Sequence, residues 1–364
     1  MEYLVPFLLA LTGMFLAPRF QSEAPKKTLV VVILLYMILL MGFRYRVGMD
    51  TMIYMKKMEE IPPINVLMRQ NILDQVYEPA YLIICSVCKY FTKEFWPIQM
   101  VMNTIMTTCV FIFLYRNCKN VFTGIFVFLL LQWLYYSTEI MRESVAISIF
   151  LLNYKNLEEK KWIRYYLFSL FSISFHYSAA LVWFLPFVRF LKPNFAYILF
   201  CIGMLAITPI VEEFNKIVNI GIVTQKLRYY VDQAEILNMN WRIAEMIKTG
   251  FPAILALVMY RYSHLENKYT HLVLLQFLFC CGAFAVPVIF QRFSNYTSVF
   301  VTVSLANYIG TRNVGVNLRA VVLGAILMSQ TIYYYSMWPT WYPYVSVFEP
   351  EKNPAREEFF RIVW

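Results

Sequence analysis

The chain has 364 residues, of which 60% are hydrophobic and only 15% are charged. This composition excludes a soluble globular domain and is typical of a protein that lies in a membrane. A formal net charge of +10 would indicate nucleic-acid binding in a soluble protein. In a membrane protein Lys and Arg mark the cytoplasmic loops, so we expect no nucleic-acid partner.

Apolar runs follow one another along the chain, and several approach the roughly 20 residues that an α-helix needs to cross a bilayer. The sequence therefore predicts an all-α, polytopic integral membrane protein with roughly 11–13 transmembrane or half-membrane helices, for which a GT-C-like helical bundle is one arrangement. We expect the first run to be a retained helix, because many more runs follow it. The predicted spans are 3–17, 29–43, 79–91, 95–115, 121–137, 141–154, 165–176, 177–191, 195–211, 243–260, 271–290, 294–310 and 319–337.

The positive-inside rule places the Lys- and Arg-rich connectors in the cytoplasm, which leaves two larger loops, 44–78 and 212–242, on the extracytoplasmic side. No linker or repeat is visible, so residues 1–364 are predicted to form one polytopic membrane domain. The number of crossings after the first loop fits this orientation only if one segment does not cross. We interpret 79–91, which is short, as a half-crossing or interfacial helix; the alternative is that 51–68 dips into the membrane.

The stretch "GFRYRVGMDT", residues 42–51, places charged residues directly after an apolar run. Arg44 and Arg46 suit a phosphate clamp, because the planar guanidinium makes two charge-assisted hydrogen bonds at once. The alternative is that both side chains reach out to lipid phosphates. Asp50 follows Gly48, where the backbone can turn freely, so its carboxylate is expected near the two arginines.

A second cluster lies in "STEIMRESVAIS", residues 137–148. Glu139, Arg142 and Glu143 are spaced three and four residues apart, so they share one face at the entrance of a helix. They form either part of a site or a self-satisfied ion pair.

Two more polar clusters are predicted on the same side of the membrane. The segment 165–191 is interpreted as two short helices that meet near His176 and Tyr177, and histidine titrates near neutrality, although a packing role is the alternative. Arg292 and Tyr296 lie at the outer end of another span. The expected gathering of all four clusters on one membrane face predicts a site there.

Five short motifs resemble those of EpsG-like, Wzy-type polysaccharide polymerases in their order and spacing. They are "FRYRVGMDTMIY" (43–54), "YEPAYLIIC" (77–85), "MRESVAISIFLLNYKNLEEKKW" (141–162), "FHYSAALVW" (175–183) and "QRFSNY" (291–296). The chain departs from the usual family pattern twice: it has Gly48-Met49-Asp50 in place of G-T-D, and Arg142-Glu143 in place of R-Q.

The resemblance implies a glycosyltransferase of the bacterial inner (cytoplasmic) membrane, with its active site on the periplasmic or extracytoplasmic side. It would join oligosaccharide repeat units, each carried on undecaprenyl diphosphate, into an O-antigen, capsule or exopolysaccharide. The implied partners are this lipid-linked oligosaccharide, membrane lipid, a chain-length regulator and a flippase. The alternatives are a flippase or transporter of the lipid-linked sugar, or a membrane glycosyltransferase that uses a polyprenyl-phosphate-sugar donor.

Within this chemistry the charged residues have distinct expected roles. The leaving diphosphate gains negative charge, which Arg44, Arg46, Arg142 and Arg292 would offset. Tyr177 and Tyr296 are expected to make other substrate contacts. A base must accept the proton of the attacking hydroxyl, and we favour Asp50 over His176, because Asp50 shares a loop with two arginines. Glu139 and Glu143 are the other candidates for the base. No metal or cofactor is expected, since no D-x-D or H-E-x-x-H spacing occurs.

Overall fold

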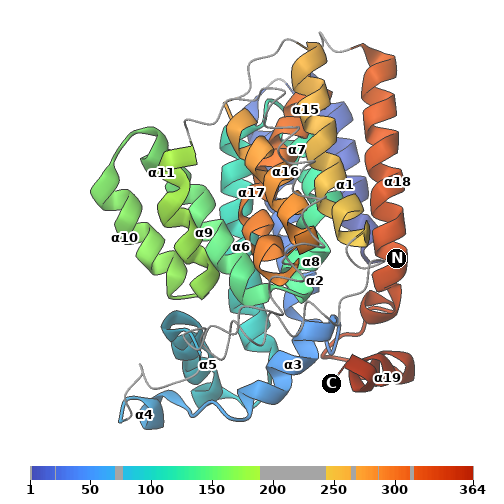
Figure 1. Cartoon of the computed structure of the whole chain (residues 1–364). Coiled ribbons are helices and arrows are strands. Elements are labelled where there is room, and N and C mark those ends of the chain that lie inside the picture. Colours follow the sequence, from blue (N-terminus) through green and yellow to red (C-terminus); the bar gives the residue numbers. More distant parts are fainter. Residues whose placement is uncertain are drawn as a thin grey trace. The chain divides into compact units, whose positions relative to one another are not determined.

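The computed structural model describes residues 2–20, 22–69, 77–188, 243–263, 268–285, 287–311 and 315–363 (Figure 1). Contacts divide the chain into two compact units, one of Met1–Trp183 with Tyr334–Trp364 and one of Phe184–Tyr333. Within the described ranges the regular elements are helices, and the strand-like pairing is an isolated antiparallel bridge between Arg44 and Ser346. The all-α prediction is therefore confirmed. The single-domain prediction stays a prediction.

Five described helices are long and apolar enough to cross a membrane, which confirms the prediction of a polytopic membrane protein. Four shorter apolar helices accompany them, Leu4–Arg19, Pro79–Phe91, Tyr177–Phe187 and Thr270–Ala283. The five long helices are Glu23–Gly42, Trp96–Asn117, Val121–Thr138, Ile243–Tyr262 and Val316–Tyr335.

The first unit is built around one central helix, Val121–Thr138, in which 94% of the 18 residues are buried. The helix comprises α7 (Val121–Phe128), a π-helical turn (Leu129–Trp133) and α8 (Leu134–Thr138). Around it α1 packs on α7, α2 packs on α6, and α6 packs on α9. The bounds of these surrounding helices are α1 Leu4–Leu16, α2 Glu23–Gly42, α6 Trp96–Asn117 and α9 Met141–Glu158.

The predicted loop 44–78 contains two short helices, α3 (Met49–Met58) and α4 (Ile64–Leu67). The chain then enters α5 (Pro79–Phe91), whose bounds match the predicted segment 79–91. Its last turn carries Lys89, whose ammonium donates hydrogen bonds to three carbonyl oxygens at the end of α3, those of Met58, Glu59 and Ile61. A lysine from α5 thus satisfies the C-terminal carbonyls of α3 and fixes the two helices together.

Two short helical stretches, 162–173 and 177–188, agree with the prediction for 165–191, whose last three residues lie outside the described residues. The helix α10 (Trp162–Ile173) packs on α9, as Figure 1 also shows. A 3₁₀ helix (Tyr177–Phe184) and α11 (Leu185–Val188) follow, and His176 lies in the connection as expected. The predicted span 195–211 and the loop 212–242 lie outside the described residues.

The second unit contains α16 (Thr270–Ala285) packed on α17 (Pro287–Ile309), and α15 (Phe251–Ser263) contacts both. The predicted break between spans, near 291–293, is instead at Pro287, because proline is favoured at the first position of a helix. Arg292 therefore lies within α17. The helix α18 (Val316–Trp341) runs from the second unit into the first, and α19 (Pro354–Val363) contacts α3.

Candidate active site

The α8–α9 connection and the first turn of α9, residues 139–143, contact residues from three other segments of the first unit. We call these five residues the turn 139–143. Its side chains contact the loop 44–51, the start of α5 and the connection around His176. Glycine is not needed in the turn itself, because Ile140 adopts an ordinary negative φ of −120°. The contacts of each residue show which side chains face one another.

Glu139 joins three separate segments. Its carboxylate is 5% exposed and accepts hydrogen bonds from Trp341 Nε1 (2.9 Å), the Thr138 hydroxyl (3.2 Å) and the backbone N–H of Asp50 (3.3 Å). These donors hold the start of α3 and the end of α18 against the turn. Its role as a base stays a prediction, and its described contacts are those of an anchor.

Arg44 is buried, with 1% of its surface exposed. Its guanidinium donates to the Met41 carbonyl and to the Thr51 hydroxyl (3.2 Å), and lies 3.8 Å from Met141 Sδ. Burial lowers the pKa of Arg44 to about 10, so the group still carries its charge at neutral pH. Arg44 therefore places a buried positive charge beneath the turn, directed at protein atoms.

Arg46 is held by a segment that the sequence reasoning did not connect with the site. We call residues 342–357 the tail segment. The backbone N–H of Tyr45 donates to the Val345 carbonyl (2.8 Å), and Arg356 donates to the Arg46 carbonyl (2.9 Å). Arg46 Nε lies 3.1 Å from Glu357 Oε1. The stretch "NPAREEFF" has a proline at a helix start, then charged residues, then two phenylalanines, which is a sequence signal for an amphipathic helix but does not identify its partner.

Gly48 adopts a φ of +91°, which confirms the predicted turn there. Its N–H donates to the Thr340 carbonyl (2.9 Å). A Cβ at this position would lie 2.5 Å from Thr138 Cβ and 3.1 Å from the Thr138 carbonyl oxygen. The loop therefore approaches α8 so closely that only glycine fits.

Replacing Gly48 by alanine is expected to destabilise the protein by about 1–3 kcal/mol, because the positive φ and the contact with Thr138 both oppose a side chain. Thermal unfolding of purified protein in detergent would measure the loss. Gly324→Ala is the matched control, since a Cβ there meets nothing within 4 Å. Equal unfolding midpoints for the two variants would contradict this account.

Arg142 is enclosed by a carboxylate and three aromatic rings. Its Nη1 lies 2.6 Å from Glu78 Oε2, and its guanidinium carbon lies 5.2 Å from the ring centres of Tyr54 and Tyr81 and 5.8 Å from that of Tyr77. Such rings attract a cation through their faces. The arrangement holds Arg142 in one orientation.

The sequence reasoning missed Glu78 and these tyrosines as site residues. A usable signal was present in "YEPAY", where a carboxylate stands directly before a proline that starts an apolar helix, between tyrosines four residues apart. Glu78 is 5% exposed, so its charge requires a partner, and Arg142 supplies it.

Glu143 and His176 are connected through a third residue, Ser178. The Ser178 hydroxyl donates to Glu143 Oε1 (3.2 Å) and lies 2.6 Å from His176 Nδ1. A backbone hydrogen bond from Ala80 to the Ser174 carbonyl (2.9 Å) holds the start of α5 beside this connection. Tyr177 is 48% exposed. The two predicted bases therefore belong to one hydrogen-bonded chain.

The remaining predicted residues are placed as follows. Asp50 is half-buried in the first turn of α3, where the helix N-terminus stabilises a carboxylate. Arg292 and Tyr296 lie in α17 of the second unit, where Arg292 is half-buried and Tyr296 is fully buried. Their predicted part in the site stays a prediction.

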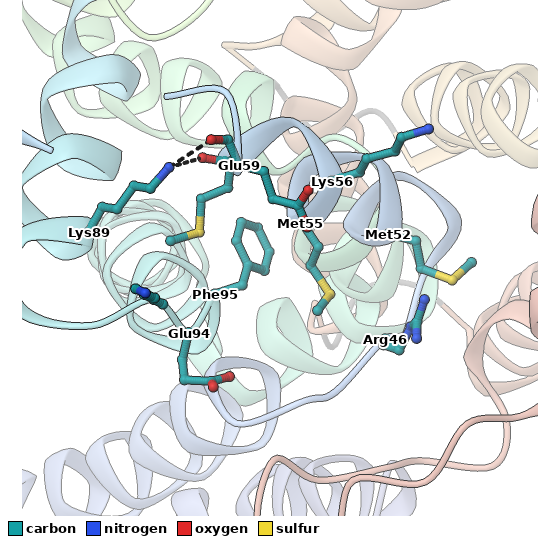
Figure 2. Close-up of a pocket in the computed structure, with 10 residues that line it drawn as sticks. Arg46, Met52, Met55, Lys56, Glu59, Lys89, Glu94 and Phe95 are labelled. Carbon is teal, nitrogen blue, oxygen red and sulfur yellow. Dashed lines mark hydrogen bonds between the residues drawn. The ribbon is translucent and has the colours of Figure 1, made fainter. Parts of the chain in front are cut away.

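We call residues 44–48 the arginine loop, and a pocket of about 650 Å³ opens beside Arg46 of this loop (Figure 2). Its apolar lining comes from methionines of α3 and from Phe95, and its charged lining has both signs. Arg46 is the one predicted site residue in the lining. The lining residues are Arg46, Met52, Met55, Lys56, Met58, Glu59, Lys89, Lys93, Glu94 and Phe95.

A family model described as the EpsG family matches residues 27–346, which is nearly the whole chain. No curated protein and no solved structure matches the chain. In the described residues, no group of three or more His, Cys, Asp or Glu side chains is placed to hold a metal ion.

Proposed function

This chain belongs to the EpsG family, and from that premise we propose that it joins lipid-linked oligosaccharide repeat units into a polysaccharide by glycosyl transfer. The family match carries the proposal, and it supports a membrane function of the polysaccharide-polymerase type. The finer statements, that the carrier is undecaprenyl diphosphate and that the reaction takes place on the outer side of the bacterial inner membrane, are part of the proposal.

The charge arrangement around the turn 139–143 supports this chemistry. Glycosyl transfer breaks the bond between an anomeric carbon and a diphosphate oxygen, so negative charge grows on the leaving group. Arg142 is the arginine best placed to offset it, since Glu78 and three tyrosines fix its orientation and its Nε has no hydrogen-bond partner among the described residues. Arg44 is buried and contacts protein atoms, so its positive charge would act on the leaving group at a distance, without touching it.

We assign the pocket beside Arg46 to the saccharide part of the substrate. A lipid chain would not suit a lining with six charged side chains, and these carry both signs: Arg46 and three lysines beside Glu59 and Glu94. Sugar hydroxyls both donate and accept, so they match ammonium and carboxylate groups placed around an apolar floor of Met55 and Phe95. The volume of about 650 Å³ is in the range of small-molecule sites.

The proposed activity is tested with purified protein in liposomes that contain a lipid-linked repeat unit. A polymerase is expected to produce a ladder of products of increasing length. A single added sugar would instead support a glycosyltransferase that uses a polyprenyl-phosphate-sugar donor, and movement of an unchanged lipid across the bilayer would support a flippase. Either result would contradict the proposal.

The ladder is expected to persist in excess EDTA. Arginines carry the leaving-group charge in this proposal, so a divalent cation is not required for it. The measurement compares chain-length distributions with and without the chelator. Loss of the ladder, followed by recovery with one added divalent metal, would overturn the assignment of that charge to arginine.

A further inference from the structure

The hydrogen bonds that connect Glu143 to His176 indicate which nitrogen of the imidazole carries its proton. Glu143 is 1% exposed, and the hydroxyl of Ser178 stands between its Oε1 (3.2 Å) and His176 Nδ1 (2.6 Å). Glu143 comes from the first turn of α9, whereas the other two residues come from the connection after α10. The three groups form a chain of carboxylate, hydroxyl and imidazole.

The direction of each hydrogen bond between these three side chains follows from the number of protons that each can donate. A carboxylate only accepts hydrogen bonds, and a serine hydroxyl has one proton to give. If that proton is directed to buried Glu143, the short contact to His176 is satisfied only when Nδ1 carries a hydrogen and donates it to Ser178 Oγ. The lone pair of the imidazole is then on Nε2.

One contact opposes this order. The backbone N–H of Ser178 also points at His176 Nδ1, at 3.3 Å, which would suit an unprotonated Nδ1. The hydroxyl contact is the stronger of the two, because it is shorter by 0.7 Å, the difference between 3.3 and 2.6 Å. The reverse order would also set a lone pair of Ser178 Oγ against the buried Glu143 carboxylate.

We propose that Ser178 is a positioning residue that couples Glu143 to His176 and holds the imidazole in the Nδ1–H tautomer, so that His176 Nε2 accepts the proton in the transfer reaction. This inference rests on the proposed function. In the reaction, the acceptor hydroxyl gives its proton to Nε2 while its oxygen bonds to the anomeric carbon. The bond from that carbon to the diphosphate breaks, and the electron pair leaves with the lipid diphosphate.

The same hydrogen bonds also stabilise the positive charge that His176 gains when Nε2 accepts the proton. The imidazolium is stabilised by Glu143 through Ser178, and it returns its Nε2 proton to water or to the departing diphosphate.

The tautomer can be measured directly, because the sequence contains only three histidines, His176, His264 and His271. Nitrogen-15 NMR of protein labelled at histidine, with His264→Gln and His271→Gln for assignment, is expected to show His176 protonated at Nδ1 and bare at Nε2. Ser178→Ala and Glu143→Gln should each reduce the Nδ1–H fraction. An Nε2–H tautomer in the unmodified protein would overturn the proposal.

Turnover provides the second readout. Ser178→Ala is expected to lower the rate of ladder formation about ten- to hundredfold, less than the hundred- to ten-thousand-fold cost of losing a general base, while lipid-linked substrate still binds. Ser178→Thr keeps the hydroxyl and should restore most of the rate. Ser174→Ala is the matched control, since its hydroxyl donates to the nearby Phe171 carbonyl.

The outcomes separate the inference from the function on which it rests. A normal rate in Ser178→Ala, with an unchanged tautomer, would overturn the positioning role although the ladder is made. An Nδ1–H tautomer in a protein that makes no ladder would instead overturn glycosyl polymerisation and leave the hydrogen-bonded chain as found.

Discussion

Replacing Arg142 by lysine is expected to lower the rate of ladder formation by about a hundred- to thousandfold, the effect of losing one oriented donor to a developing anion. Lysine keeps the positive charge, but a point charge cannot reproduce the planar fork that contacts Glu78 and faces three tyrosine rings. The measurement is the initial rate of polymerisation by purified protein in liposomes, together with binding of the lipid-linked substrate.

Stability must be separated from catalysis in this experiment. Breaking a buried ion pair costs about 3–5 kcal/mol, because it leaves one charge without a partner. Glu78→Gln is the matched control: it breaks the same pair but keeps the guanidinium. If Glu78→Gln retains most of the rate at a temperature where both variants are folded, the loss in Arg142→Lys belongs to the reaction. A fully active Arg142→Lys would show that Arg142 only packs.

The second large effect is expected at the proton acceptor. His176→Gln should reduce turnover by about a hundred- to ten-thousand-fold, because no group then accepts the hydroxyl proton. Asp50→Asn should retain much more activity. Asp50 lies in the first turn of α3, where its backbone N–H donates to Glu139 and its carboxylate favours the start of the helix. Both variants are compared in the liposome assay.

This order reverses the preference that the sequence alone suggests. Asp50 is close to two arginines along the chain, whereas the case for His176 depends on contacts with residues that sequence spacing does not connect. A dead Asp50→Asn variant that folds and binds substrate, beside an active His176→Gln, would return the role of the base to Asp50.

Local features of the sequence predicted the elements well. The bounds of α5 follow from an apolar run that begins at a proline, and the turn at Gly48 follows from the conformational freedom of glycine. The helix start at Pro287 was missed because the apolar run continues through it, so hydrophobicity alone placed the break a few residues late.

Contacts between residues that are far apart in the sequence could not be predicted from the sequence alone. Glu78 and Arg142 are separated by 64 positions, and Glu139 and Trp341 by 202. The pattern of each segment predicts that a buried charge needs a partner, but many partners satisfy that requirement equally well. Only the packing of α5, α9 and α18 decides among them. Ser178 gave no signal, because a serine near a histidine is common and its contact with Glu143 depends on how α10 lies against α9.

The pinning of the arginine loop by the tail segment has a consequence for biosynthesis. The hydrogen bond from Arg356 to the Arg46 carbonyl joins residues 310 positions apart, and Tyr45 likewise depends on Val345. A ribosome therefore delivers the loop to the membrane early and its backbone partners only after α1 to α18 have been synthesised. During that interval the loop lacks the contacts that set its conformation. A nascent chain stalled before residue 340 would carry Arg44, Arg46 and Arg142 without the backbone partners that the tail segment supplies to this loop.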